Sequence, residues 1–200
     1  MAQPMNTQDA LQLVLPVIDV LERLGVAYRI GGSVASGYYG LLRGTHDVDL
    51  VADLQMQHVA PFVAAFDPNV YLVVDHSVVD AIIHQSQFNI IDLRTMNKID
   101  VFIQEHTPFA QQGQQRAHPV VLVPGTRPLW MASAEDMILQ KIHWWQLGGG
   151  ISTTQWDDIV QMLRRQSATL DRPYLAQNAT TLNITTLLQQ ACADAGVPFP

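Results

Sequence analysis

Three aspartates stand in stretches of sequence that otherwise favour buried strands. Asp47 and Asp49 lie in the segment HDVDLVA, and Asp100 lies in KIDVFI. Aspartate is disfavoured in strands, and burying an isolated carboxylate is costly. Alternate residues of a strand project from the same face, about 6.5 Å apart, so Asp47 and Asp49 share a face while Val48 and Leu50 point into the core. If the strand that carries Asp100 lies next to theirs, the three carboxylates converge on one patch.

Three neighbouring carboxylates need a positive counter-charge. Without one they repel each other, and at least one has to stay protonated. Two divalent ions about 3.5–4 Å apart resolve the repulsion, because carboxylate oxygens are hard ligands that suit Mg²⁺. Such ions activate an attacking hydroxyl and hold the phosphoryl group that is displaced. The pattern therefore predicts a site for two Mg²⁺ ions formed by Asp47, Asp49 and Asp100.

Two alternatives compete with this interpretation. A single D-x-D pair in an acidic protein is often no more than a pair of exposed strand or loop residues. Asp92, in the segment IIDL, competes with Asp100 for the place of the third acid. We choose Asp100 because Ile99, Val101 and Phe102 frame it with apolar residues.

A glycine turn precedes the first two aspartates. Gly31, Gly32 and Ser33 follow a short apolar segment and open a helix. Glycines let a ligand approach the backbone closely, and the N–H groups at a helix N-terminus attract phosphate oxygens. Ser33 can cap the helix or donate its hydroxyl to a phosphate. The turn is not a Walker A loop, because no Lys-Ser or Lys-Thr pair follows at the required spacing.

The combination of these motifs resembles the nucleotidyltransferase superfamily that includes DNA polymerase beta. The matching elements are Gly-Gly-Ser at 31–33, Arg-x-Thr-x-Asp-Val-Asp at 43–49 and Ile-Asp-Val at 99–101. The similarity is greatest to the small bacterial members, the minimal nucleotidyltransferases and the AbiEii-type toxins. It covers residues 25–105 well and the C-terminal region loosely.

The resemblance implies a role for each matching residue. A nucleoside triphosphate is expected on the glycine turn, and the family binds two Mg²⁺ with its acidic triad. Arg43 and Thr45 match the lead-in to the triad and are expected to brace the turn and the first carboxylate. Lys141 is expected to face the nucleotide phosphates, and Asp157 or Asp158 resembles a later acid that serves the acceptor hydroxyl. By resemblance, the phosphate-binding and metal-binding residues are Gly31, Gly32, Ser33, Asp47, Asp49 and Asp100.

The elements that must position these residues form an α/β (α+β) core with a mixed sheet, followed by a helical region. We expect the core at 1–125 and the helical region at 126–200. Thr7 suits the N-cap of the first helix, and Pro16 should kink or split that helix. The predicted strands are 27–30, 47–52, 71–74, 88–93, 98–104 and 120–123. The predicted helices are 7–24, 34–42, 55–66, 77–85, 133–147, 153–165, 171–178 and 183–195.

Composition narrows the class of protein further. The 200 residues are 48% hydrophobic and 14% charged, which excludes disorder. Of the 18 acids, nine fall within 47–105, against Arg94 and Lys98 alone, so the net charge of −7 is concentrated there. The single cysteine, Cys192, excludes an internal disulfide framework. No membrane-spanning run or secretory signal is visible, so a cytoplasmic protein without a membrane partner is expected.

The sequence therefore predicts an enzyme, a Mg²⁺-dependent nucleotidyltransferase. It would move a nucleoside monophosphate from a nucleoside triphosphate to a hydroxyl acceptor and release pyrophosphate. The acceptor is open between a tRNA end, a protein side chain and a small molecule. An antitoxin protein is a possible partner only through the likeness to AbiEii-type toxins. The competing interpretation is a catalytically inactive module of the same fold that binds a nucleotide or a partner protein.

Overall fold

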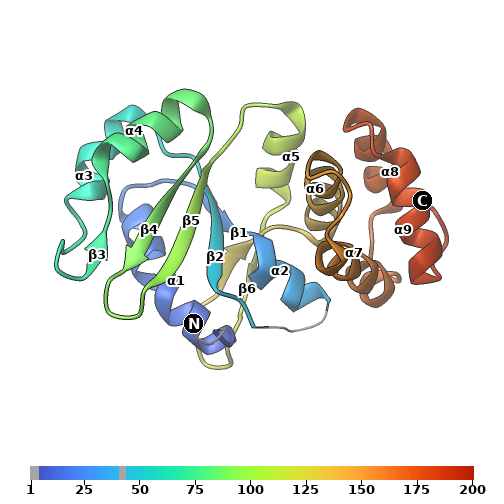
Figure 1. The fold of residues 1–200 in the computed structure, drawn as a ribbon, viewed down its shortest axis with the longest axis horizontal. Helices are drawn as coiled ribbons and strands as arrows, with labels where there is room; N and C mark the ends of the chain where they lie inside the picture. The colour runs from blue at the N-terminus through green and yellow to red at the C-terminus, as the bar shows by residue number, and fades with distance from the viewer. Residues whose placement is uncertain (1–4, 41–43) are drawn as a thin grey trace. The chain divides into compact units, whose positions relative to one another are not determined.

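The computed structural model describes residues 5–40 and 44–200. They form two compact units, residues 5–34 with 44–131 and residues 35–40 with 132–200. Within the described residues, the first unit contains a mixed seven-stranded sheet with flanking helices, and the second is helical (Figure 1). The predicted fold class is thereby confirmed. The division into domains at 1–125 and 126–200 stays a prediction.

Two parallel strands, β2 (Asp47–Ala52) and β5 (Asn97–Ile103), form the middle of the sheet. The neighbour of β5 is β4 (Gln87–Asp92), which pairs with it as an antiparallel hairpin, as the spacing predicts. The strand order is β3-β4-β5-β2-β1-β7-β6. The remaining strands are β1 (Tyr28–Ile30), β3 (Tyr71–Leu72), β6 (His118–Val120) and β7 (Leu129–Met131).

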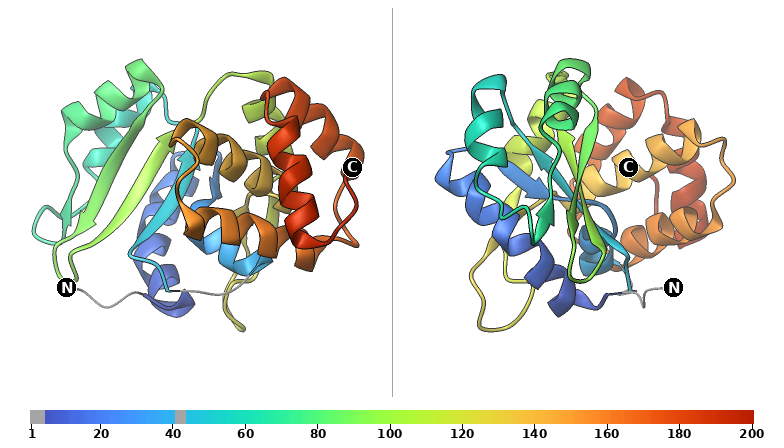
Figure 2. Two further views of the ribbon diagram at one scale, coloured as in Figure 1. Left: turned by 45° about the vertical axis from the view of Figure 1, so that its right-hand side comes forward. Right: turned by 60° about the vertical axis from the view of Figure 1, so that its left-hand side comes forward.

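The two faces of this sheet have different surroundings. On β2, Val48 and Leu50 are fully buried, whereas Asp47 and Asp49 on the opposite face are partly exposed. Helix α1 lies behind the strands in Figure 1, and the left view of Figure 2 shows α3 and α4 beside β4 and β5. The covered face holds the apolar core, which leaves the other face for the carboxylates. The helices named here are α1 (Thr7–Arg23), α3 (Val59–Val63) and α4 (Asp75–His84).

The first helix differs from the prediction in two ways. It runs without a break through Pro16, and its N-cap is Asn6, whose side chain accepts from the N–H groups of residues 8 and 9, rather than Thr7. A proline inside a helix removes one hydrogen bond, at a cost of about 3 kcal/mol. Val14 and Val17, on either side, are buried, and fully burying each stabilises by roughly 1.5–3 kcal/mol. Packing of the helix therefore outweighs the proline.

Other elements were predicted in the wrong place or missed. The helix expected at 55–66 is a 3₁₀ turn, η1 (Met56–His58), followed by the short α3. The strand expected at 120–123 is shifted to β6, and β7 was not predicted. Helix α5 (Pro108–Arg116) was also missed, because its polar sequence has no apolar periodicity. Its signals were the cap at Thr107 and a proline in the first helical position.

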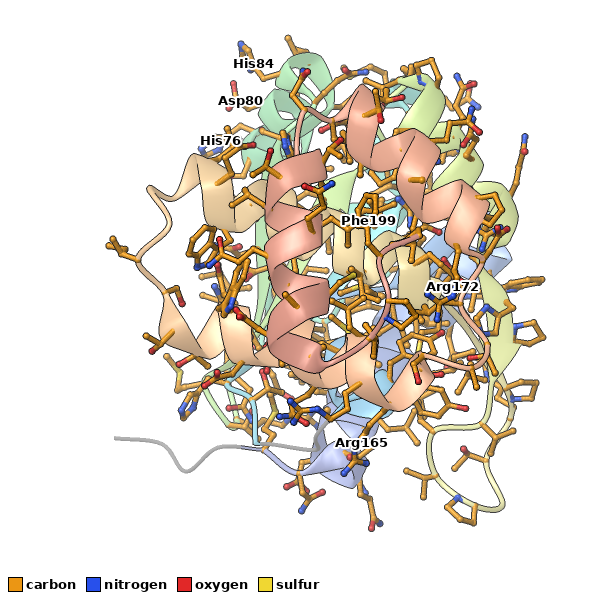
Figure 3. All side chains as sticks on the ribbon, turned by 90° about the vertical axis from the view of Figure 1, so that its right-hand side faces the viewer. His76, Asp80, His84, Arg165, Arg172 and Phe199 are labelled. Atoms are coloured by element: carbon orange, nitrogen blue, oxygen red, sulfur yellow. The ribbon has the colours of Figure 1, made fainter. Side chains whose placement is uncertain are left out.

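The second unit is built from helices that the sequence locates well. Ser133 caps the first long helix by accepting from the Asp136 N–H, as predicted. Arg172 donates to the carbonyl of Pro198, near the end of the chain. Figure 3 labels Arg172 and Phe199, the residue after this proline. Among the described residues, no helix combines the length and apolar composition that crossing a membrane requires. The helices are α2 (Gly32–Tyr39), which begins in the first unit, α6 (Ala134–Leu147), α7 (Thr153–Gln166), α8 (Arg172–Thr181) and α9 (Thr185–Ala195).

The hairpin between β4 and β5 is closed by Asp92, the alternative third acid. Its buried carboxylate accepts from the Arg94 backbone N–H at 2.9 Å and pairs with the Arg94 guanidinium at 2.7 Å. The hydrogen bond from Arg94 holds the pKa of Asp92 below its usual value of 3.8. Asp92 therefore has a structural role in the turn.

The role of Asp92 in the turn predicts that the wild type and Asp92→Asn differ in stability by an amount that depends on pH. Because the pKa of Asp92 is lowered in the folded state, its ionised form stabilises the fold above pH 3.8, and this contribution is lost as the pH falls through the lowered pKa. We expect Asp92→Asn to unfold at lower urea concentration than the wild type at pH 7, with the gap closing in acid. Asp80→Asn, which alters an exposed pair with His84, is the control and should change little. A gap that persists at low pH would contradict this account.

Candidate functional site

The pairing of β2 with β5 brings two of the three predicted acids side by side. In the parallel register, Asp49 lies opposite Asp100, and Asp47 lies opposite Lys98. Since residues two apart in a strand share a face, Asp47, Asp49, Lys98 and Asp100 all project from the same side of the sheet. The structure thus collects the three carboxylates on one face, together with a lysine. We call these four side chains the carboxylate face.

Lys98 is the functional candidate that the sequence analysis missed. Its Nζ lies 2.8 Å from Asp100 Oδ2. This hydrogen bond raises the pKa of Lys98, burial opposes the increase, and the charges of Asp100, Asp47 and Asp49 add to it. The ammonium group therefore lies in the field of all three carboxylates. A lysine two residues before an aspartate in a strand was the signal that could have identified it.

Asp100 is the most buried of the three acids. Its residue is 5% exposed, and its Oδ1 is buried with no hydrogen-bond partner among the described residues. A buried carboxylate oxygen without a partner is costly, and native structures rarely leave one without a reason. Lys98 satisfies Oδ2, which leaves Oδ1 as an acceptor that no described residue uses.

The glycine turn packs directly on Asp49. The Gly31 N–H donates to the Asp49 carbonyl at 2.9 Å, and the Ser33 N–H lies 3.4 Å from Asp49 Oδ2. Gly32 has a φ of +52°, and a Cβ built on it would overlap the Asp49 carboxyl group and lie 2.7 Å from the Asp49 Cβ. A side chain at position 32 is therefore excluded both by the backbone and by the carboxylate.

Thr45 contacts the first acid of the carboxylate face. Its Oγ1 lies 2.9 Å from the Asp47 carbonyl oxygen and 3.1 Å from Asp47 Oδ1, so its hydroxyl can donate to either. The residue is buried and its backbone bridges to Met5. Arg43, the other residue predicted to brace the turn, lies outside the described residues. His46 is exposed.

Lys141 lies in the second unit, where it contacts a carboxylate. Its Nζ is 3.0 Å from Asp158 Oδ2, and the side chains are 13% and 12% exposed. Asp157, the neighbouring candidate for a role toward the acceptor, is exposed. The contact of Lys141 with nucleotide phosphates stays a prediction. A phosphate that binds the Lys141 ammonium group would have to compete with the Asp158 carboxylate.

The histidines on α4 offer no competing site. His84 forms an exposed pair with Asp80, one helical turn earlier, with 3.1 Å between His84 Nδ1 and Asp80 Oδ1. His76 lies on the same helix and is exposed as well (Figure 3). Such groups in high dielectric have the character of solvated surface residues.

Solved structures with similar architecture identify the fold. The chain is similar to an antigenic nucleotidyltransferase-like protein from Paracoccidioides brasiliensis, with a TM-score of 0.56 and 18% identity over 98% of this chain and 96% of that one. It is also similar to ANT(2″)-Ia in complex with adenylyl-2″-tobramycin, with a TM-score of 0.58 and 13% identity over 86% and 96%. The fold is that of the nucleotidyltransferases. No protein-family model and no curated protein matches the chain.

The nucleotidyltransferase fold predicted from the glycine turn and the acids is thereby confirmed. The identities show the fold alone, so the residue roles and the AbiEii-type likeness stay predictions. A solution structure of ANT(2″)-Ia gives a TM-score of 0.51 at 13% identity over 96% of this chain and 98% of that one, in agreement.

The donor set of the carboxylate face fits a divalent metal ion. It consists of carboxylate oxygens, the ligands that Mg²⁺ prefers, and includes the unpartnered Asp100 Oδ1. Among the described residues, no group of three or more His, Cys, Asp or Glu side chains is already arranged to hold an ion. The contacts explain this arrangement, because Asp100 is turned to Lys98 and Asp49 to the Ser33 N–H. An entering ion has to take its ligands from these contacts.

Replacement of the turn glycine tests how closely the turn and Asp49 are packed. We expect Gly32→Ala to lower the free energy of unfolding by about 2–5 kcal/mol, since positive φ costs about 1–2 kcal/mol and overpacking adds about 1–3 kcal/mol. Gly25→Ala is the matched control, because Gly25 has a φ of +69° and nothing within 4 Å of a Cβ there. It should lose about 1–2 kcal/mol. Equal losses in urea unfolding would show that Asp49 yields to the added methyl group.

Proposed function

We propose that this chain is a divalent-metal-dependent nucleotidyltransferase, which moves a nucleoside monophosphate from a nucleoside triphosphate to a hydroxyl group. The observation that carries the proposal is the register that sets Asp49 beside Asp100, with the glycine turn packed on the Asp49 carboxyl group. The fold supports it, because similar structures include a protein in complex with an adenylylated antibiotic. In this reaction the acceptor hydroxyl oxygen bonds to the α-phosphorus and its proton is released to water. The bond between the α-phosphorus and the oxygen that bridges to the β-phosphorus breaks, and pyrophosphate leaves with that oxygen.

In this proposal the aspartates bind metal ions, and the glycine turn and Thr45 position the substrate and the carboxylates. Asp47, Asp49 and Asp100 would hold two Mg²⁺ ions, which when bound neutralise charge on the attacking and leaving oxygens. The open backbone of 31–33 leaves room for phosphate oxygens, and the Ser33 hydroxyl can donate to one of them. Thr45 orients Asp47 through its hydroxyl. Positioning of this kind supplies much of the rate of phosphoryl transfer.

A small hydroxyl compound is the acceptor that we favour. Half of the acids of this chain fall in residues 47–105, and such a concentration of negative charge repels a long polyanion. The acceptor in one similar structure, tobramycin, belongs to this small-molecule class. A tRNA end, a protein side chain and an antitoxin partner are the other outcomes, and an assay open to all acceptors separates them.

A non-catalytic nucleotide-binding module is the second candidate. The observation in its favour is the orientation of Asp100, whose carboxylate is engaged by Lys98. Such a module would gain thermal stability from ATP with Mg²⁺, because a ligand selective for the native state raises the melting temperature, but would transfer nothing. A transfer assay therefore separates the two functions.

Transfer of label from α-³²P nucleoside triphosphates is the direct test. The purified chain is incubated with each labelled nucleotide, Mg²⁺ and a cell extract fractionated into small molecules, RNA and protein. We expect labelled product in the small-molecule fraction, and Asp49→Asn should reduce it at least about a hundredfold, as loss of charge stabilisation at a reacting phosphate does.

The matched control for this assay is Asp53→Asn. Asp53 follows the same strand and accepts from the Gln55 side chain at 2.7 Å, outside the carboxylate face. It should keep transfer close to the wild-type rate. Transfer that survives Asp49→Asn would refute the site, and absence of transfer with ATP-dependent stabilisation would favour the binding module.

A further inference from the structure

Lys98 lies where a bound cation would neutralise the carboxylate face. Its ammonium group contacts Asp100 Oδ2 at 2.8 Å, and β2 places Asp47 directly opposite it in the register. The charges of Asp47 and Asp49 act on it as well. Strand β4, on the other side of β5, places the uncharged Asn89 opposite Asp100. Among the described residues of β2, β4 and β5, Lys98 is thus the one positive charge on this face. On the next strand, β1, Arg29 lies on the same face but donates to two glutamine side chains.

We propose that Lys98 is a placeholder cation, meaning that it neutralises the carboxylates in the metal-free protein and leaves Asp100 when a divalent ion binds. The inference rests on the proposed function, because it concerns the same metal site. It assigns to Lys98 a positioning role that sets the metal affinity of the site, and not a part in bond formation.

The two oxygens of Asp100 support this assignment. Lys98 engages Oδ2, whereas Oδ1 is buried without a partner among the described residues. A divalent ion that binds the carboxylate adds two charges beside the ammonium group, and Coulomb repulsion then favours movement of Lys98 away. The Lys98 side chain is 39% exposed, against 8% for Asp100, so the lysine has a path to solvent while the carboxylate stays in place.

Replacement of the Lys98 ammonium group by a metal ion couples metal binding to the ion pair between Lys98 and Asp100. Breaking the pair between Lys98 and Asp100 costs free energy, which is subtracted from the affinity of the site for the ion. Without the lysine, the three carboxylates repel each other until a metal ion enters. Removal of the positive charge should therefore weaken the metal-free fold and strengthen metal binding.

The test measures Mn²⁺ binding to the full chain by electron paramagnetic resonance, with Mn²⁺ alone and with ATP present. For Lys98→Met we expect Mn²⁺ affinity to rise about three- to fivefold, the factor that corresponds to a partly exposed ion pair. The melting temperature without metal should fall, and added Mn²⁺ should raise it more than in the wild type. Lys98→Gln, which keeps a polar side chain, should behave alike and serves if Lys98→Met does not fold.

Arg94→Met is the matched control. It removes a cation that pairs with a buried aspartate on the same hairpin, and that aspartate, Asp92, points to the other face of the sheet. Its Mn²⁺ affinity should equal that of the wild type. Lys98→Arg keeps the charge and should also stay near the wild-type affinity.

The outcomes separate this inference from the proposed function. Mn²⁺ affinity that is unchanged or weaker in both neutral variants overturns the placeholder role but leaves a metal site in place. If neither the wild type nor the variants bind Mn²⁺ with ATP present, the metal dependence in the proposed function fails, and the placeholder role fails with it. Equal gains in Lys98→Met and Arg94→Met would show a general effect of net charge and would also overturn it.

Discussion

Carboxylates on neighbouring strands repel each other across a distance set by the backbone, and a cation among them relieves that repulsion. In this protein the parallel register of β2 and β5 fixes that distance, because it sets Asp49 opposite Asp100. Lys98, on the same face, supplies positive charge. The glycine turn and Thr45 then orient the acids, so that the surrounding contacts follow from one electrostatic constraint.

Apolar residues on the opposite side of the same strands hold this face in register. Val48, Leu50, Ile99 and Val101 alternate with the acids and the lysine and are fully buried on the opposite side. Their burial stabilises the pairing of β2 with β5, and a slip of one residue would send the carboxylates into the core. The packing of apolar side chains therefore keeps the polar ones in register.

Much of this arrangement could be predicted from local sequence, because strands alternate with a period of two and glycine turns have a characteristic composition. The faces of Asp47 and Asp49 and the β4–β5 hairpin follow from such signals. The parallel pairing of β2 with β5 joins residues far apart in the sequence and has no local signal. The convergence of the three carboxylates could therefore be predicted only on the assumption that these strands are neighbours. The contact of Lys98 with Asp100 was missed because the charge of Lys98 was considered only as part of the net charge of residues 47–105. Its position two residues before Asp100 places it on the same face of the strand. Helix α5 was missed because capping, and not apolar periodicity, marks it.

The account depends on a metal ion shared by β2 and β5. Crystals grown with Mn²⁺ and a non-hydrolysable ATP analogue allow the ion to be located by its anomalous scattering. The account predicts a peak within about 2.0–2.4 Å of carboxylate oxygens from both Asp49 and Asp100, with the triphosphate against the glycine turn. A bound nucleotide with no peak between these two side chains, or with Mn²⁺ held elsewhere on the chain, would contradict it.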